Sequence, residues 1–256
     1  NVARVGAIAG DLAGAEEMFA LRLLLQRLWV KNYDCRQDGG VLDPRLGRAS
    51  YLFNATIEGI EAADAILLVG TNPRLEAAVL NARIRKRWRM GGLSVGLVGQ
   101  RVPLTYDTTY LGAGPETLTE IADGRGDFAR VLNDAQRPMV IVGAGMAARP
   151  AGAGVMALAA RIALAASAGK SIGAVAFNVL HTAAARVAGL DLGFVPADGG
   201  MATGAMLAAA AKGGLDLLIL LGADEIDTAR LAGTFVVYIG SHGDAGAHRA
   251  DVILPG

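Results

Sequence analysis

One cysteine is present in the 256-residue chain, in the segment NYDCRQDGG (32–40) between Asp34 and Arg36. A thiol acts as a nucleophile or a metal ligand only as the thiolate, so its reactivity depends on surroundings that lower its pKa. No neighbouring feature of the sequence guarantees such a shift, and one cysteine cannot form an internal disulfide. From this segment alone, a reactive and a structural role for Cys35 both stay open.

Three histidines offer imidazole groups. His242 and His248 flank Asp244 near the end of the chain, and two imidazoles with a carboxylate would suit zinc. Their spacing of six residues across two glycines matches no helix face, so a metal-dependent enzyme using these three residues is the weaker alternative. His181, in FNVLHTAAARV, is expected to be a buried, hydrogen-bonded residue on an apolar helix. No G-x-S-x-G motif of a serine hydrolase occurs.

Three glycine-bearing loops follow predicted strands, in LLVGTNPRLE, VIVGAGMAARP and LILLGADEID. Open parallel sheets bind ligands outside the carboxyl ends of their strands, so these loops are the places to seek a site. Strand-end glycines expose backbone N–H groups, and Arg74 or Arg149 could meet a phosphate. The candidate cofactor-binding residues are Gly70, Asn72, Pro73, Arg74, Gly143, Gly145, Gly222 and Asp224.

The middle loop invites a dinucleotide-binding interpretation, because Gly143, Gly145 and Ala148 spell G-x-G-x-x-A after a strand. The fingerprint also needs a helix that begins inside the motif and an acidic residue about 20 positions later. Pro150 instead favours a helix that starts after the motif, and no Asp or Glu occurs between 135 and 190. A plain tight turn is therefore the preferred interpretation.

Alternating apolar and helical stretches must position these loops. Nearly continuous apolar runs predict strands buried on both faces at 2–10, 64–70, 93–99, 138–145, 216–224 and 234–240. Helices are expected at 14–30, 54–63, 74–90, 115–123, 150–168, 178–189 and 203–213, and 124–137 is expected to be a polar connection. The alternation predicts an α/β fold with doubly wound, mainly parallel sheets and helices on both faces. A boundary near 135 would divide it into two α/β halves, 1–135 and 136–256.

The charge and the hydrophobic content of the chain limit the classes of binding partner that can be expected. The formal net charge is zero, which gives no electrostatic argument for nucleic acid or an anionic membrane. Although 53% of the residues are hydrophobic, the most apolar stretch, 151–169, carries Arg161 at its middle, so no direct membrane insertion is expected. The basic run RIRKRWR (83–89) surrounds its predicted helix with charge. A solvated surface is the first interpretation of this run, and a contact with a neighbouring subunit is the second.

Several of these segments, taken in order, resemble the molybdopterin oxidoreductase superfamily. They are NYDC…GG, NATIEGIEAADAILLVGTNPRLEAAVLNARIRK, RPMVIVGAG, LLGADE and GDAGAHRADVILPG. Within the superfamily, the chain is similar to the C-terminal part of the large iron–sulfur subunit, of the 75 kDa type, of NADH:quinone oxidoreductases (respiratory complex I). The stretch LLVGTNPR…LNARIRK and the closing ADVILPG are the specific parts of this resemblance. It implies a fold like that of formate dehydrogenase and DMSO reductase.

The resemblance also implies a role for the cysteine segment. In catalytic members, a similar segment leads to the Cys, selenocysteine or Ser that ligates molybdenum. That pattern places Gly40 at the ligand position and Asp38 where the family has an arginine. Glycine offers no side chain to a metal, and Cys35 lies five residues too early. The resemblance therefore implies no metal site, no catalytic residue and a structural role for Cys35.

For function, the resemblance implies a structural, non-catalytic body in the hydrophilic arm of an assembly that transfers electrons from NADH to a quinone. The parent subunit would carry 2Fe–2S and 4Fe–4S clusters on a preceding iron–sulfur region, and we expect the chain to be a fragment of that longer polypeptide. One cysteine cannot build a cluster that needs about four protein ligands. Partners would be other subunits of the arm, at the cytoplasmic side of the membrane. The alternative is a relict or active pocket for a nucleotide or molybdopterin.

Overall fold

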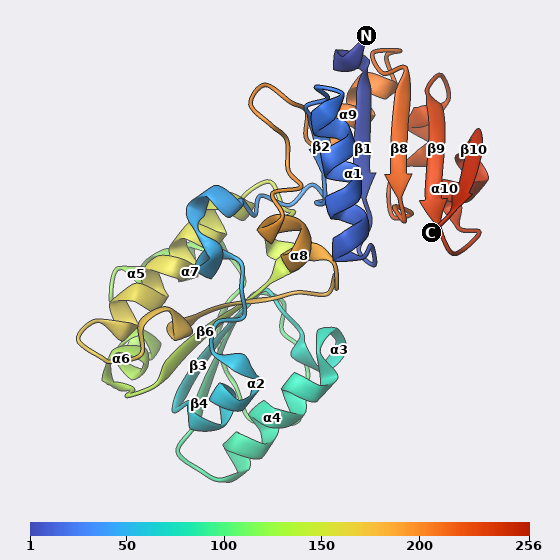
Figure 1. Ribbon diagram of the computed structural model, residues 1–256. Coiled ribbons are helices and arrows are strands. Elements are labelled where there is room, and N and C mark those ends of the chain that lie inside the picture. Colours follow the sequence, from blue (N-terminus) through green and yellow to red (C-terminus); the bar gives the residue numbers. More distant parts are fainter. The chain divides into compact units, whose positions relative to one another are not determined.

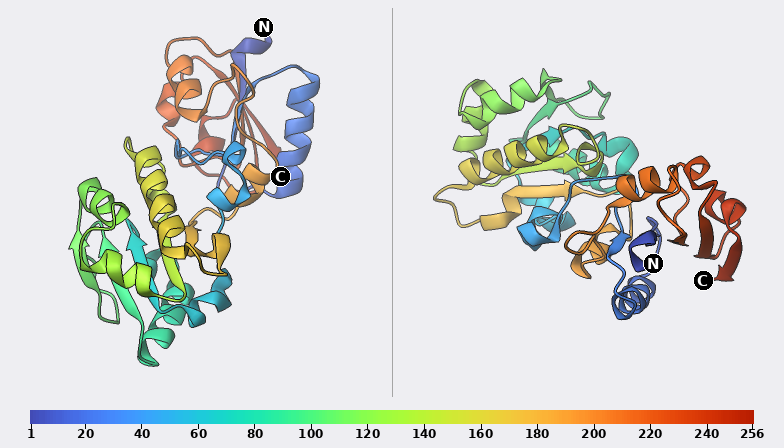
Figure 2. Two further views of the ribbon diagram at one scale, coloured as in Figure 1. Left: turned by 90° about the vertical axis from the view of Figure 1, so that its left-hand side faces the viewer. Right: turned by 90° about the horizontal axis from the view of Figure 1, so that it is seen from above.

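The computed structural model describes the backbone of residues 1–256 and the side chains of all of these except 173 and 174. The chain forms two compact units. Unit 1 consists of Asn1–Gly39 and Ala183–Gly256, and unit 2 consists of Gly40–Thr182. Each unit has its own sheet (Figures 1 and 2). No helix in the described part of the chain is both long and apolar enough to cross a bilayer.

The sheet of unit 1 is parallel throughout and has the order β10-β9-β8-β1-β2. Its strands are β1 (Val5–Ala9), β2 (Asn32–Asp34), β8 (Leu217–Leu221), β9 (Phe235–Gly240) and β10 (Val252–Pro255). Because β1 and β8 are central neighbours, the chain leaves the sheet centre in opposite directions from these two strands. Their carboxyl ends therefore mark the topological switch point of this sheet.

Four helices flank this sheet: α1 (Ala15–Arg27), α8 (Arg186–Asp191), α9 (Thr203–Ala210) and α10 (Ala245–Arg249), with short 3-10 helices at Val2–Arg4 and Thr228–Leu231. Met206 of α9 and Ala247 of α10 join the core on the face that carries Ile8 and Leu218. Helix α1 covers the opposite face, as Figure 1 shows. Strand β1 is thus covered on both sides, whereas β9 alternates between buried and more exposed residues and β10 is exposed along its length.

The sheet of unit 2 is also parallel, with the order β5-β4-β3-β6-β7. Its strands are β3 (Ala65–Val69), β4 (Ser94–Val98), β5 (Thr109–Gly112), β6 (Pro138–Gly143) and β7 (Phe177–Leu180). The chain winds outward from β3 to β5, then returns to the centre at β6. The switch point of this sheet lies between the carboxyl ends of β3 and β6.

Helices lie on both faces of the second sheet as well. Leu67, Val69 and Val142 pack on one side with residues of α5 (Pro115–Ala122), α6 (Asp127–Asp134) and α7 (Gly152–Ser167). Ile66 and Ile141 pack on the other side with α4 (Ala78–Arg89). The remaining elements are α2 (Thr56–Gly59), α3 (Pro73–Glu76) and 3-10 helices at Pro44–Leu46, Arg48–Ser50, Ile60–Ala62, Ala144–Met146 and Gly173–Ala176. The predicted doubly wound α/β architecture is confirmed.

The six predicted strands are all present, and the sequence pattern missed or misjudged shorter elements. The predicted helix 178–189 is wrong over its first part, because residues 177–180 form β7, which extends the sheet beside β6. The predicted helix 74–90 is broken into α3 and α4 at Ala77, whose backbone is extended (φ −153°, ψ 70°). The polar stretch 124–137, expected to be a connection, contains α6.

The two compact units do not coincide with the predicted halves 1–135 and 136–256. The predicted boundary near 135 falls inside unit 2, between α6 and β6. The reason lies in the pairing of strands: β6 joins β3 at the centre of one sheet, so the chain on either side of 135 belongs to one core.

Candidate functional site

The predicted candidate residues lie at the switch points of the two sheets. Gly70, Asn72, Pro73 and Arg74 follow β3, and Gly143 and Gly145 lie at and just beyond the end of β6. These two loops touch, because a Cβ atom at Gly143 would lie 2.7 Å from the carbonyl oxygen of Gly70. Gly222 and Asp224 follow β8 in unit 1, beside the loop after β1. The sequence pattern missed that partner loop, which begins at Gly10.

In unit 2, side chains of the chain itself fill the switch point. Gly70 adopts a left-handed backbone (φ +57°), and a Cβ there would lie 2.2 Å from the Sδ of Met146. The Glu76 carboxylate accepts the backbone N–H of Asn72 at 2.6 Å and the hydroxyl of Thr71 at 2.8 Å. The amide that opens α3 is therefore already bonded to a carboxylate, which would repel an incoming phosphate.

The other candidates of this loop do not converge on a common point. The Nη1 of Arg74 donates to the carbonyl oxygen of Pro103 at 3.2 Å, away from the start of α3. Gly145 faces open space, with nothing within 4 Å of a Cβ placed there. The Oδ1 of Asn72 is buried without a hydrogen-bond donor among the described residues, so it would suit a donor and not a phosphate oxygen.

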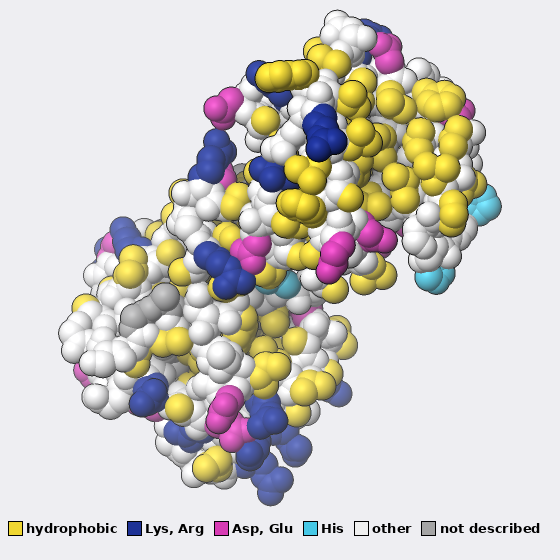
Figure 3. Space-filling model, in the orientation of Figure 1, with side chains coloured by type: hydrophobic (Ala, Val, Ile, Leu, Met, Phe, Trp, Pro, Cys, Tyr) yellow, Lys and Arg dark blue, Asp and Glu magenta, His cyan; other side chains and the backbone are white. Residues whose placement is uncertain are grey.

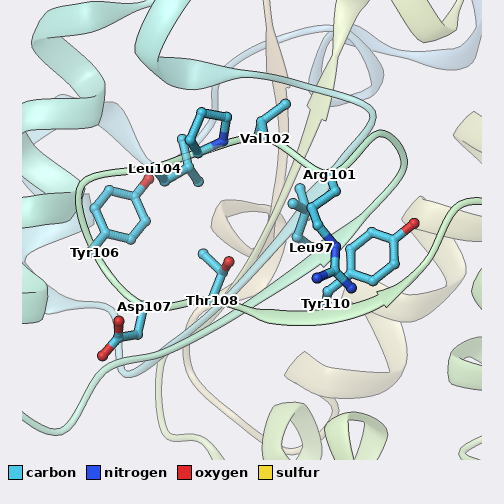
Figure 4. A pocket seen from close by; sticks show the side chains of 9 residues that line it. Leu97, Arg101, Val102, Leu104, Tyr106, Asp107, Thr108 and Tyr110 are labelled. Atoms are coloured by element: carbon cyan, nitrogen blue, oxygen red, sulfur yellow. The ribbon is translucent and has the colours of Figure 1, made fainter.

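A hollow of about 520 Å³ lies in the loop between β4 and β5, where no site was predicted. Figure 4 shows Arg101 beside the ring of Tyr110, and the guanidinium carbon lies 4.3 Å from the ring centroid. The Tyr106 hydroxyl donates to the Oδ1 of Asn81 at 2.9 Å, and burial raises the pKa of this tyrosine. The Tyr106 hydroxyl and the Arg101 guanidinium are thus engaged in contacts within unit 2.

At the switch point of unit 1 the loops after β1 and β8 meet backbone to backbone, and a hollow of about 180 Å³ lies beside them, lined by residues that include Leu12, Gly222 and Asp224. A Cβ at Gly10 would lie 1.8 Å from the carbonyl oxygen of Gly222, so the two loops are in direct contact. Asp224 accepts the N–H of Gly246 at 2.8 Å and the hydroxyl of Tyr238 at 3.1 Å. Burial, together with the Asp224 carboxylate, raises the pKa of Tyr238 to about 12. Asp224 therefore holds α10 and β9 in place.

A charge cluster that the sequence pattern missed lies next to this contact. Arg186, at the start of α8, has only 2% of its side chain exposed and pairs with Asp11 at 3.4 Å and with Asp38 at 3.1 Å. Gln37 donates to the carboxylate of Glu225. Burial, with the nearby Glu225 and Asp38 carboxylates, raises the pKa of Asp11 in spite of Arg186. The available signal was a lone arginine in the apolar stretch TAAARVAGL.

Cys35 is part of the core of unit 1. Its side chain is 2% exposed, and a Cβ at Gly189 would lie 2.7 Å from its Sγ. Burial, helped by the Asp34 carboxylate, raises the pKa of the thiol to about 12. A thiol in this setting stays protonated at neutral pH, so the geometry favours the structural role over the reactive one.

The histidines do not form a metal site. The described residues contain no group of three His, Cys, Asp or Glu side chains that could hold a metal ion. His181 follows β7 instead of lying on a helix, and its Nε2 is 2.6 Å from the carbonyl oxygen of Tyr51. His242 hydrogen-bonds to the neighbouring Ser241 at 2.9 Å. The interpretation as a metal-dependent enzyme has no support in this geometry.

A molybdopterin cofactor does not fit the residues present. Glu76 occupies the amide at one switch point, and the carboxylates of Asp11, Asp38 and Glu225 crowd the other around a single arginine. Both arrangements oppose the phosphates of a pterin dinucleotide. The position that the resemblance assigns to the metal ligand is Gly40, which has no donor atom in its side chain.

Comparisons with known proteins agree with this fold. The chain is 41% identical over 254 residues to the mitochondrial NADH dehydrogenase (ubiquinone) iron–sulfur protein 1 of Solanum tuberosum, covering 97% of the chain and 32% of that protein. It is 40% identical over 252 residues to the G subunit of the NADH-quinone oxidoreductase of Rickettsia felis, covering 98% of the chain and 36% of that protein. The chain thus spans about a third of the length of these relatives.

A solved structure shares the fold at low sequence identity. A chain of the formyltransferase/hydrolase complex of Methylorubrum extorquens, determined with methylofuran, superimposes with a TM-score of 0.61 and 18% identity. The match covers 98% of this chain and 79% of that one, and at this identity it shows the fold alone. The family model for molybdopterin oxidoreductases matches residues 1–256, and this chain belongs to that family.

Proposed function

We propose that this chain is a non-catalytic α/β body within the large iron–sulfur subunit of an NADH:quinone oxidoreductase. The observation that carries the proposal is that the chain's own side chains occupy the switch point of unit 2. Met146 and Glu76 lie in it, and at the switch point of unit 1 the loops after β1 and β8 are in backbone contact at Gly10 and Gly222. A fold that normally binds ligands at these points has used its own atoms there.

The relatives supply the context for this proposal. They are named as subunits of enzymes that oxidise NADH with a quinone as acceptor. In our proposal the 2Fe–2S and 4Fe–4S clusters belong to other parts of the subunit, since the single cysteine here is buried and cannot supply about four ligands. The body is proposed to lie in the hydrophilic arm, peripheral to the cytoplasmic face of the membrane, with other subunits of the arm as partners.

One surface suited to a neighbouring subunit is the basic helix α4. Lys and Arg side chains gather over this helix in Figure 3. Arg83 and Lys86 share the single carboxylate of Glu61, Arg85 and Arg87 donate to carbonyl oxygens, and Arg89 is exposed. The patch therefore keeps an excess of positive charge. Guanidinium groups pair well with carboxylates, so an acidic protein surface is the proposed partner of α4.

The non-catalytic role is tested by obstructing the more open loop of unit 2 in the full-length subunit, assembled in its complex. Gly145→Leu would extend a side chain into the open space beside the β6 loop, and Gly154→Leu, on the exposed side of α7, is the matched control because a Cβ atom meets nothing within 4 Å at either position. We expect both variants to keep the NADH:quinone activity of the parent complex, and elemental analysis to find no molybdenum or tungsten. Stoichiometric molybdenum, or activity lost in Gly145→Leu alone, would contradict the proposal.

The α4 contact is tested separately by charge reversal. Arg89→Glu places a negative charge on the exposed end of α4, and Arg130→Glu on α6 serves as the control because both arginines are exposed. We expect recovery of the assembled complex to fall with Arg89→Glu and to stay unchanged with Arg130→Glu. Equal recovery of the two variants would remove α4 from the interface.

A further inference from the structure

One face of the sheet in unit 1 is apolar and, among the described residues, has no covering helix over β9 and β10. Side chains alternate between the two faces along a strand, and residues in register across parallel strands share a face. Phe235 on this face is 50% exposed, Leu254 is 46% exposed and Val252 is 38% exposed. Figure 3 shows hydrophobic side chains gathered over these strands. The set, called the open face below, consists of Ile219, Phe235, Val237, Ile239, Val252 and Leu254.

The connections between the strands explain why this face is open. Leu231, between β8 and β9, and Ala247, between β9 and β10, both pack in the core on the opposite face, with Leu218 and Val236. Helix α1, which connects β1 to β2, lies on the side of the open face but over β1 (Figure 1). Crossovers between parallel strands are right-handed, so strands added in opposite directions from the centre have their crossovers on opposite faces. The connections of β8, β9 and β10 therefore leave the open face without a layer of its own.

The parallel pairing of the strands indicates what kind of element covers the open face. All-parallel sheets occur with helices on both faces, because their strands are apolar on both sides. The sheet of unit 2 follows this rule, with α5, α6 and α7 on one face and α4 on the other. Packing of two sheets face to face is instead the arrangement of β-sandwiches, so a second copy of the open face is not the expected occupant. The missing layer is expected to be an α-helix.

The length of the relatives indicates where that helix comes from. This chain covers 32% of one relative and 36% of another, so most of such a polypeptide lies outside these 256 residues. An apolar sheet face left open until subunits assemble would promote aggregation while the subunit folds, whereas a layer from the same polypeptide is present during folding. We propose that an α-helix from the part of the same polypeptide outside residues 1–256 covers the open face, which rests on the proposed place of the chain within the large subunit.

The experiment uses the full-length subunit purified with its complex. A photo-cross-linking phenylalanine analogue replaces Phe235, and the same analogue in place of Lys212, exposed just after α9, is the control. Mass spectrometry of material at the mass of one subunit locates the cross-linked peptide. We expect position 235 to join a helical segment of the same polypeptide outside residues 1–256, and position 212 to show only background. A cross-link from position 235 to another subunit or to a second copy, or none above background, would overturn the proposal.

Substitution gives an independent measurement. Phe235→Glu places a carboxylate on the open face, and Phe19→Glu on α1 is the matched control because Phe19 is 47% exposed. A covering helix would remove water from the carboxylate that Phe235→Glu introduces. We therefore expect the melting temperature of the full-length subunit to fall by about 5 °C or more beyond the change in Phe19→Glu. Equal shifts would show that the face is open to solvent and would overturn the proposal. If the unmodified polypeptide purifies without the complex while position 235 still cross-links within it, the proposed function fails and the covering helix stands.

Discussion

The Glu76 carboxylate lies 2.6 Å from the backbone nitrogen of Asn72, at the point where α3 begins. In doubly wound sheets, the N–H groups that follow a central strand are the usual donors to a bound phosphate. Here an internal carboxylate accepts that N–H and also the hydroxyl of Thr71. The loop is thereby stabilised without a ligand. A fold that binds ligands in other proteins can therefore remain stable here in a purely structural role.

Removing this carboxylate should cost stability. Glu76→Ala leaves the Asn72 N–H and the hydroxyl of the buried Thr71 without their acceptor, so we expect the free energy of unfolding to fall by about 1–2 kcal/mol. Urea denaturation measures the change. Glu120→Ala, on the exposed side of α5, is the control and should change stability by less than about 0.5 kcal/mol. Equal effects from the two variants would show that Glu76 does not act as a cap.

Two glycines of unit 2 should respond differently to alanine. Gly70 has a left-handed backbone and would press its Cβ against Met146, so Gly70→Ala should lower stability by more than about 1–2 kcal/mol. Gly145 has open space around it, so Gly145→Ala should change stability by less than about 0.5 kcal/mol. Thermal unfolding of the pair measures the difference. A tolerated Gly70→Ala would mean that Met146 does not fill the switch point.

The buried arginine of unit 1 should be required for stability. Arg186→Met keeps the volume but leaves Asp11 and Asp38 facing each other without a cation. We expect a loss of roughly 2–3 kcal/mol, less than for a fully buried pair because both aspartates stay about one-third exposed. Arg161→Met, which removes an exposed pair with Asp123, should cost less than about 1 kcal/mol.

The pH dependence of this loss checks its cause. The folded-state pKa of Asp11 is raised, so the folded chain holds this proton more tightly than the unfolded chain does. Protonation at low pH therefore relieves the repulsion that Arg186→Met exposes, and the loss should be smaller near pH 4 than near pH 7. A loss that does not depend on pH would point to packing around the methionine instead of charge.

The long apolar strands could be predicted from sequence because each is a nearly continuous apolar run, and β3 and β6 are buried on both faces. Short elements could not. Residues 32–34 form β2 from only three residues, two of them polar, and their pairing with β1 supplies what the local pattern lacks. The pattern at 178–189 predicts a helix because the alanine-rich stretch after β7 dominates the window. The division into units depends on strand order, which no local pattern contains.

The candidate site, like the fold, could be predicted from the sequence only in part. Glycines at strand ends can be predicted because a chain that leaves a buried strand needs a tight turn, and both switch points include such residues. Their chemistry could not be predicted, since it depends on side chains from elsewhere in the chain. Met146 meets Gly70 from the next loop of the sheet, and Arg186 reaches Asp11 across 175 positions. The resemblance to a cofactor-binding family predicts binding groups at these loops, whereas in unit 2 the side chains of Met146 and Glu76 occupy that space.

The buried thiol leads to a final prediction, about alkaline pH. The pKa of Cys35 is raised from its ordinary value of 9.0 to about 12, so above pH 9 the unfolded chain loses this proton while the folded chain retains it. Fewer protons are then bound in the unfolded state, and the free energy of unfolding must fall as the pH rises from about 9 toward 12. Tyr238, with a pKa also raised to about 12, contributes with the same sign above its ordinary value of 10.0.

Denaturation of the unmodified chain and of Cys35→Ala between pH 8 and pH 11 separates the contributions of Cys35 and Tyr238. The free energy of unfolding should decline less steeply with pH in the alanine variant. In parallel, a thiol reagent should label Cys35 at pH 8 only after denaturant is added. Rapid labelling of the native chain, or identical pH slopes for the two proteins, would show that the thiol is neither buried nor protonated as the structure indicates.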